Sequence, residues 1–114
     1  MSCFNSKIVD APLSTVWAAV RDFHQLGWAS GVVEACEKIG DLAGNQIGAR
    51  RRLNGVFEET LQGLNDLDHT ITYTIDKGPG PLDGVQGYVG RVRLSALTDG
   101  DRTVVEWACH RQPP

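Results

Sequence analysis

Residues 47–76 read IGARRRLNGVFEETLQGLNDLDHTITYTID, and this stretch decides the fold. Three strands are expected in it, over residues 47–53, 56–64 and 70–76. Asn54-Gly55 separates the first two, and this dipeptide is the strongest short signal for a β-hairpin because both turn positions accept positive φ. Residues 65–68 (Asn-Asp-Leu-Asp) turn the chain again. The stretch therefore predicts an antiparallel meander.

Alternation along these strands predicts which side chains share a face, since successive side chains of a strand point to opposite sides. If Arg51 faces inward, Ala49 and Leu53 do so too, and the neighbouring arginines face solvent. If Glu59 faces inward, the same parity selects its strand's other inward members. The inward-facing set expected in this way is Phe57, Glu59, Leu61 and Gly63. In the next strand, alternation places Ile71, Tyr73 and Ile75 on one face and Thr70, Thr72 and Thr74 on the other.

Further elements are expected on both sides of this meander. A strand over residues 3–9 precedes Asp10-Ala11-Pro12, and a helix follows, because Leu13, Val16, Trp17 and Val20 have helical spacing. The helix is expected to end near Asp22-Phe23. The remaining strands are expected over residues 32–39, 85–96 and 103–109. The order is thus one strand, one helix, a short link and six consecutive strands, an α+β architecture whose sheet has one apolar face to cover.

Composition excludes several classes of protein. The 114 residues carry a formal charge of −3, with 41% hydrophobic and 22% charged residues, which is typical of a globular domain. Mild acidity argues against a nucleic-acid partner, and the short apolar runs argue against membrane insertion. The first residues do not resemble a secretion signal. We expect a cytoplasmic protein whose three cysteines, Cys3, Cys36 and Cys109, are reduced.

Motifs for cofactors and metals are not found in the sequence. The histidines and cysteines do not have ligand spacing, and there is no P-loop, G-x-G-x-x-G or G-x-S-x-G motif. We therefore expect no cofactor and no metal. The triple arginine at residues 50–52 is expected to be mostly a solvated face, because no aromatic residues interleave it.

The ordered segments resemble the helix-grip (START-like, or SRPBCC) superfamily, and most closely its bacterial polyketide cyclase/dehydrase-like members. The resemblance implies a seven-stranded antiparallel sheet that grips a long C-terminal helix, with a ligand cavity between the two. The segments that carry it are Val9-Asp10-Ala11-Pro12 with Val16-Trp17, Val20-Arg21-Asp22-Phe23, residues 48–53, Glu59-Thr60-Leu61, residues 72–75 and residues 103–107.

The sequence departs from that family at its end. It stops at Pro113-Pro114, where the long helix of the family begins. We expect a single helix-grip domain over residues 1–114 that lacks this helix, with its sheet face open. An exposed apolar face of that kind favours self-association or a partner, and a homodimer that covers the open face is one expectation.

Arg51 and Glu59 are the candidate catalytic residues. Both match charged cavity positions that the plant relative onion lachrymatory-factor synthase is expected to use. A carboxylate in an apolar cavity has a raised pKa and can exchange protons, and a neighbouring guanidinium can stabilise an oxyanion. The alternatives are an anchor for a ligand and an ordinary cross-strand pair.

Further residues either match positions that line the ligand cavity in the family or have side chains suited to contacting a ligand. Glu34 stands where hormone-receptor relatives carry a ligand-anchoring lysine, which disfavours an acidic ligand if Glu34 faces inward. Residues 77–84 resemble the loop at the cavity mouth. The candidate ligand-binding residues are Trp28, Glu34, Phe57, Leu61, Tyr73, Pro79, Tyr88 and Trp107.

Three functions follow from these observations. The first is binding of a small hydrophobic or aromatic molecule in the concavity of the sheet. The second is a cofactor-free cyclase or dehydratase, of the lyase or isomerase type, that uses Glu59 as acid–base and Arg51 to polarise the substrate. The third is a subunit that associates through its open sheet face.

Overall fold

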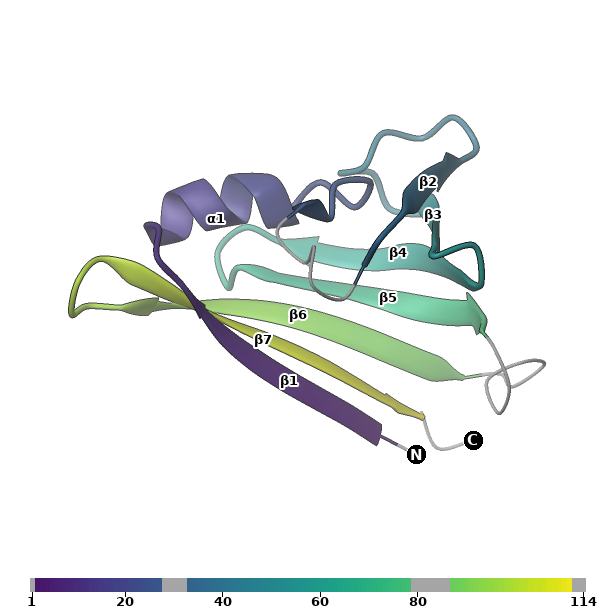
Figure 1. The fold of residues 1–114 in the computed structure, drawn as a ribbon. Coiled ribbons are helices and arrows are strands. Elements are labelled where there is room, and N and C mark those ends of the chain that lie inside the picture. The colour runs from purple at the N-terminus through teal and green to yellow at the C-terminus, as the bar shows by residue number, and fades with distance from the viewer. Residues whose placement is uncertain (1, 28–32, 79–86, 112–114) are drawn as a thin grey trace.

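The computed structural model describes residues 2–27, 33–78 and 87–111 (Figure 1). This part of the chain holds one α-helix and seven strands. Their bounds are β1 Ser2–Val9, α1 Leu13–Val20, β2 Cys36–Ile39, β3 Arg50–Leu53, β4 Phe57–Asn65, β5 Thr70–Lys77, β6 Tyr88–Leu97 and β7 Arg102–Arg111. Among the described residues, no helix follows β7, and the seven-stranded sheet with its short helix is that of the expected helix-grip fold.

The strands form one curled antiparallel sheet in the order β1-β7-β6-β5-β4-β3-β2 (Figure 1). Neighbours in sequence are neighbours in the sheet, except that β1 pairs with β7 and so brings the two ends of the chain together. The helix α1 lies over one face of the sheet, which we call the inner face. This confirms the predicted meander, its antiparallel pairing and the α+β class.

The helix α1 forms where the sequence predicts it, but it is shorter. Pro12 has an extended conformation, and its carbonyl accepts hydrogen bonds from the backbone N–H groups of Thr15 and Val16. The apolar stripe of Val16, Trp17 and Val20 is buried against the sheet. The indole Nε1 of Trp17 donates a 2.7 Å hydrogen bond to the Asp66 carboxylate in the β4–β5 turn, which fixes the helix across the sheet.

The core lies on the inner face and consists of two clusters. The larger cluster joins α1 and Phe23 to inner side chains of β4 to β7, among them Leu61, Ile71 and Tyr73. The smaller cluster contains Leu26, Val33 and Leu53. Phe57 and Trp107 are half-buried and pack against both clusters, so they lie where the two meet.

Two of the predicted strands are too long. The expected start of the second strand, residue 32, lies outside the described residues. Of the residues that follow it, Glu34 and Ala35 do not enter a ladder, because their backbone N–H groups donate to the side-chain oxygen of Asn54, and β2 begins at Cys36. The third strand begins at Arg50 and not at Ile47. Gly48 has a φ of 96°, in the region that favours glycine, and this bend ends the strand.

The prediction that Gly63 faces inward is wrong. The pairing of β4 with β5 shifts between Leu61 and Gly63, so Gly63 lies opposite Thr72 and Leu64 lies opposite the buried Ile71. An extra residue in one strand reverses the facing of all that follow it. The other inward members of β4 face the inner side as expected, and the apolar set of β5 shares that face.

The expectation of three reduced cysteines is also wrong. Cys3 and Cys109 are joined by a disulfide, and Cys36 is the free cysteine of the described residues. The two bridged residues are 106 positions apart in sequence but lie directly opposite in the β1–β7 register, with their Cα atoms 5.0 Å apart. That distance suits a disulfide, and only the sheet topology creates it.

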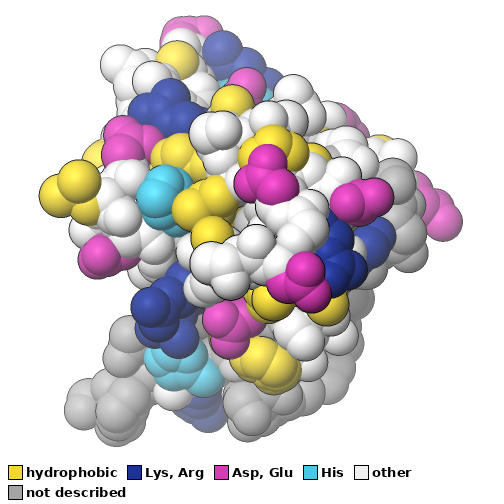
Figure 2. All heavy atoms as spheres, turned by 90° about the vertical axis from the view of Figure 1, so that its left-hand side faces the viewer, with side chains coloured by type: hydrophobic (Ala, Val, Ile, Leu, Met, Phe, Trp, Pro, Cys, Tyr) yellow, Lys and Arg dark blue, Asp and Glu magenta, His cyan; other side chains and the backbone are white. Residues whose placement is uncertain are grey.

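The surface is mixed in charge. Figure 2 shows one end of the molecule, where hydrophobic side chains lie in separate groups among acidic and basic ones. Among the described residues, no helix is long and apolar enough to cross a membrane.

Candidate functional site

A buried ion pair occupies the inner face between β3 and β4. Arg51 and Glu59 are directly opposite each other in the β3–β4 register. Arg51 Nε donates a 2.8 Å hydrogen bond to Glu59 Oε1, and both residues are almost wholly buried, at 1% and 3% exposure. The two candidate catalytic residues are therefore brought together, on the face that also carries the core.

Three neighbouring groups hold the Arg51 guanidinium in place. Its Nη1 donates a 3.1 Å hydrogen bond to the backbone carbonyl of Phe23. Its Cζ lies 3.8 Å from the centre of the Phe23 ring and 5.0 Å from that of Tyr73. A guanidinium close to an aromatic face is attracted to it electrostatically. The segment that follows α1 thus supplies both a hydrogen-bond acceptor and an aromatic face to the buried cation.

The ion pair leaves one polar atom with unused hydrogen-bonding capacity. Arg51 Nη2 lies 2.7 Å from Glu59 Oε1, but it has no partner in hydrogen-bond geometry. Both guanidinium contacts to the carboxylate reach Oε1. Buried polar groups are normally satisfied, so this unsatisfied donor in the interior could take an acceptor on another molecule.

Burial also changes the acid–base behaviour of this region. Desolvation raises the pKa of Glu59, and the Arg51 charge and its hydrogen bond oppose that rise without cancelling it. Desolvation, with the nearby Glu59 charge, raises the pKa of Tyr73 above its ordinary value of 10.0. Tyr73 is therefore a neutral phenol at neutral pH, and Glu59 is a stronger proton acceptor than an exposed glutamate.

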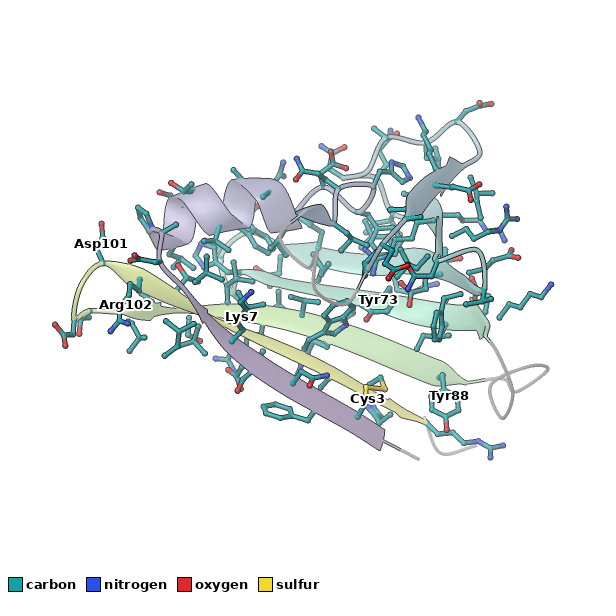
Figure 3. All side chains as sticks on the ribbon, viewed as in Figure 1. Cys3, Lys7, Tyr73, Tyr88, Asp101 and Arg102 are labelled. Carbon is teal, nitrogen blue, oxygen red and sulfur yellow. A yellow bond between two sulfur atoms is a disulfide. The ribbon has the colours of Figure 1, made fainter. Side chains whose placement is uncertain are left out.

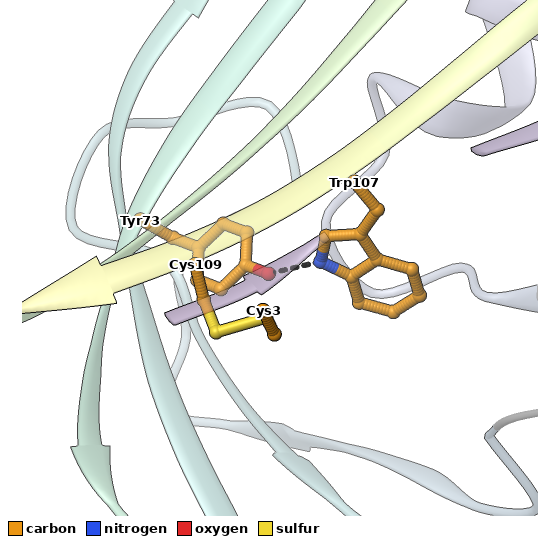
Figure 4. Close-up of a disulfide and its surroundings, with 4 residues drawn as sticks. All are labelled: Cys3, Tyr73, Trp107 and Cys109. Carbon is orange, nitrogen blue, oxygen red and sulfur yellow. Dashed lines mark hydrogen bonds between the residues drawn. A yellow bond between two sulfur atoms is a disulfide. The ribbon is translucent and has the colours of Figure 1, made fainter. Parts of the chain in front are cut away.

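An aromatic pair, Tyr73 and Trp107 (Figure 4), adjoins the ion pair, since Arg51 Cζ lies 5.0 Å from the centre of the Tyr73 ring. The indole Nε1 of Trp107 on β7 donates a hydrogen bond to the hydroxyl oxygen of Tyr73 on β5. The strand between them, β6, carries Gly90 opposite Tyr73, so no side chain separates the two rings. The disulfide lies in the same cross-strand row, since Gly90 is opposite Cys109 and Cys109 is opposite Cys3.

The other predicted site residues fall into three groups. Phe57 and Leu61 lie on the inner face beside Glu59, half-buried and buried respectively. Tyr88 is buried at the start of β6, on the same face (Figure 3). Glu34 is exposed and precedes β2, so it is not among the inner-face residues. Trp28 and Pro79, with most of the expected entrance loop, lie outside the described residues.

The triple arginine divides as its alternation predicts. Arg50 and Arg52 face the outer side, where both reach Glu58, at 3.2 and 3.7 Å, and Arg52 also reaches Glu37 at 3.6 Å. These pairs are partly exposed, which makes them weak. Of the three arginines, Arg51 is the one that enters the interior.

Sequence reasoning missed three contributors to the site. Phe23 supplies a carbonyl and a ring to Arg51, but the sequence places it only at the end of a helix. Cys36 lies close enough for the charges of Arg51 and Glu59 to act on its thiol, whose pKa burial raises. Gly90 makes room for Tyr73. Of the three, only Gly90 has a signal in the sequence: a glycine inside a predicted strand often marks a place where another group approaches the backbone closely.

The outer face carries a different feature, a groove of about 600 Å³. It lies beside the β4 bulge, which turns Gly63, a residue without a side chain, to the outer face. The groove is lined by Gly63, Leu64, Asn65, Asp68, Thr70, Thr72, Arg91 and Arg93. The groove is polar, and it is separated from the ion pair by the sheet itself. Among the described residues, no three His, Cys, Asp or Glu side chains are grouped as a metal site requires.

Comparisons with known proteins agree with this fold. The model of a family described as polyketide cyclase/dehydrase and lipid transport matches residues 3–114. A structure of a protein from Nitrosospira multiformis is 38% identical, with a TM-score of 0.88, over 98% of this chain and 79% of that one.

More distant structures show the same fold. A solution structure from Thermobifida fusca is 20% identical with a TM-score of 0.78, over 99% of this chain and 74% of that one. A crystal structure of an uncharacterised protein from Bacillus thuringiensis is 20% identical with a TM-score of 0.74, over 99% and 79%. The search of curated proteins gave no match.

Proposed function

This chain belongs to the polyketide cyclase/dehydrase and lipid transport family, and on that premise we propose that it binds a small hydrophobic or aromatic molecule on the inner face of its sheet. The family includes carriers of apolar molecules and enzymes that act on them, so the family alone does not choose between binding and catalysis. The choice rests on the residues around Arg51 and Glu59.

The observation that carries the proposal is a buried polar atom without a hydrogen-bond partner, close to apolar side chains of the inner face. Phe57 and Trp107 are half-buried where the two core clusters meet. Close to this junction lies Arg51 Nη2, which is buried and has no hydrogen-bond partner. Binding sites for small molecules combine a mostly apolar lining with a few polar groups in this way.

This arrangement fits a molecule with a flat apolar body and one polar end. The body would pack beside the Phe57 and Trp107 side chains, and a hydroxyl or carbonyl at its end would reach the ion pair. A carbonyl oxygen would accept a hydrogen bond from Arg51, and a hydroxyl would donate one to Glu59. A charged ligand is disfavoured, because the pair already neutralises itself in a buried place.

A cofactor-free cyclase or dehydratase is the second candidate, and the raised pKa of Glu59 favours it. In that reaction Glu59 would take a proton from carbon or oxygen, and Arg51 would stabilise the oxyanion that forms. Glu59→Gln separates the two functions, because it keeps the shape and removes the base. Turnover that falls at least a hundredfold while binding stays within threefold would support catalysis.

Binding is tested with Nile red, a neutral planar dye whose fluorescence rises in apolar surroundings. We expect saturable binding by the wild type and at least tenfold weaker binding by Trp107→Ala. Leu67→Ala, which truncates a side chain that is 91% exposed in the β4–β5 turn, is the control and is expected to bind as the wild type does. Equal binding by folded Trp107→Ala would contradict the proposal.

We also propose a cytoplasmic location, as the sequence predicts. Disulfides are rare in that compartment, so the oxidation state of the Cys3–Cys109 pair in the cell tests this location. Alkylation of thiols at the moment of lysis, followed by mass spectrometry, measures this. A bridge already complete at lysis would count against a cytoplasmic location.

A further inference from the structure

The sheet has an open edge at β1. Strand β1 pairs with β7 along its whole length, and no described strand pairs with its other side (Figure 1). It is eight residues long, whereas the strand at the opposite edge, β2, has four. An unpaired edge strand offers a row of backbone N–H and C=O groups to another chain.

This edge carries few of the features that protect natural sheets. Positions 3–8 are all exposed, and they include two large apolar side chains, Phe4 at 63% and Ile8 at 52%. The β1–β7 register runs without a bulge, and β1 contains no proline. Its one charged residue, Lys7, lies on the inner side together with Cys3 (Figure 3), and Asn5, opposite Trp107, shares that face. Bulges, prolines and several charges are the usual defences of an edge.

The two apolar side chains share the outer face. In the β1–β7 register Phe4 is opposite Ala108 and Ile8 is opposite Val104, so both belong to the face away from Trp107. They are four positions apart on one strand, with Ser6 between them on the same face. The outer face of β1 therefore reads apolar, small polar, apolar, and this order is symmetric about Ser6.

We propose that two copies of this chain pair through β1, antiparallel and about a twofold axis at Ser6, so that their sheets become continuous. In this register Phe4 of each copy is opposite Ile8 of the other, and Asn5 is opposite Lys7. A twofold interface requires a self-complementary surface, and β1 provides one: both apolar side chains gain an apolar cross-strand partner, and no like charges meet.

Two neighbouring registers of the β1–β1 pair also place outer side chains opposite outer ones, but both have less favourable cross-strand pairs. An axis at Asn5 places Phe4 opposite Ser6, so the apolar side chains lose their partners. An axis at Lys7 places the two Lys7 side chains opposite each other, and like charges in that position are destabilising. A shift by one residue places inner side chains against outer ones. The register centred on Ser6 is therefore the expected one.

The proposal does not depend on the ligand. It places the second copy at the sheet edge, not over the inner face, and so differs from a dimer that would close the open side of the sheet. A single pair of strands buries less surface than a standard interface, so association is expected to depend on concentration, with dissociation in the micromolar range.

Charged side chains introduced at the two paired positions, Phe4 and Ile8, give a sharp test of the dimer by sedimentation equilibrium. Phe4→Lys/Ile8→Lys places lysines opposite each other twice, and we expect at least tenfold weaker dimerisation. Phe4→Lys/Ile8→Glu places a lysine opposite a glutamate twice, and dimerisation is expected within threefold of the wild type. Ile47→Lys/Leu67→Lys changes two comparably exposed apolar residues away from β1 and is expected to leave the dimer intact.

Cross-linking tests the register in the Cys36→Ser background. Ser6→Cys places two thiols opposite each other on the twofold axis, so oxidation is expected to give a covalent dimer, and Asn5→Cys is expected to give much less. A wild type that stays monomeric at several hundred micromolar would overturn the proposal. So would a dimer that survives Phe4→Lys/Ile8→Lys, or an Asn5→Cys that cross-links as well as Ser6→Cys.

Discussion

The ring of Tyr73 lies against the backbone of Gly90 so closely that a β-carbon at position 90 would sit 2.2 Å from its Cζ atom. Gly90 is directly opposite Tyr73 in the β5–β6 register. The missing side chain lets the phenol cross β6 and accept the hydrogen bond from Trp107 on β7. One glycine thus allows two strands that are not neighbours to share a contact.

Gly90→Ala is therefore expected to displace Tyr73. Overpacking of this kind costs about 1–3 kcal/mol of unfolding free energy, and the Trp107–Tyr73 hydrogen bond should be lost with it. Urea denaturation measures the stability, and tryptophan emission reports the change around Trp107. Gly27→Ala is the control, because a β-carbon there would meet its nearest neighbour at an ordinary 3.7 Å. Equal stability of the two variants would contradict the steric argument.

Breaking the buried ion pair should be costly. Arg51→Met leaves the Glu59 carboxylate without its partner in the interior, and we expect a loss of about 3–5 kcal/mol. Arg51→Met/Glu59→Leu removes both charges and should recover most of that loss. Arg52→Ala breaks ion pairs that are partly exposed, and should cost no more than about 1 kcal/mol. Chemical denaturation measures all three. A double variant no more stable than Arg51→Met would refute this account.

The raised pKa of Glu59 predicts a pH dependence. Because its pKa is higher in the folded protein than its ordinary value of 4.5, the folded state binds this proton more tightly than the unfolded state does. The stability that comes from this tighter binding of the Glu59 proton is therefore fully present below pH 4.5, and it is lost as pH rises through the raised pKa of the folded state.

Glu59→Gln provides the comparison, because glutamine does not titrate. The unfolding free energy of the wild type minus that of Glu59→Gln should fall as pH rises above 4.5 and then level off. A difference that rises with pH over this range would mean that the charge of Arg51 outweighs desolvation. Carbon-detected NMR titration of the Glu59 carboxyl gives the pKa directly.

Reduction of Cys3–Cys109 should destabilise the chain. The bridge closes a loop of 106 residues, and a cross-link over a long loop restricts the unfolded ensemble, which typically contributes about 2–4 kcal/mol. Thermal unfolding with and without a phosphine reductant measures the effect. Cys36→Ser, which removes the free thiol, should leave the difference unchanged. Identical unfolding of oxidised and reduced protein would show that the bridge adds nothing to stability.

Much of the fold can be read from local sequence. The Asn54-Gly55 turn, the alternation in residues 70–76 and the stripe of α1 all place elements where the structure has them. These signals are local, because turn chemistry and side-chain period act between residues a few positions apart. The strand ends were less predictable, since Asn54 takes the N–H groups of Glu34 and Ala35 out of β2 through a tertiary contact.

The candidate site was predictable only in part. Parity and family resemblance selected Arg51, Glu59, Tyr73 and Trp107, and all four lie on the inner face. The contributions of Phe23 and Cys36 depend on where the chain after α1 passes over β3, and no local pattern encodes that path.

The sequence by itself determined the antiparallel meander, the amphipathic helix and the presence of two opposite charges at inward positions. Its short-range patterns are enough for these, because a strand's facing follows from a period of two. The tertiary structure decided the bulge that turns Gly63 outward, the meeting of Cys3 with Cys109 and the free edge of β1. Each depends on which strands become neighbours, and that is settled by burial of the whole inner face rather than by any single segment.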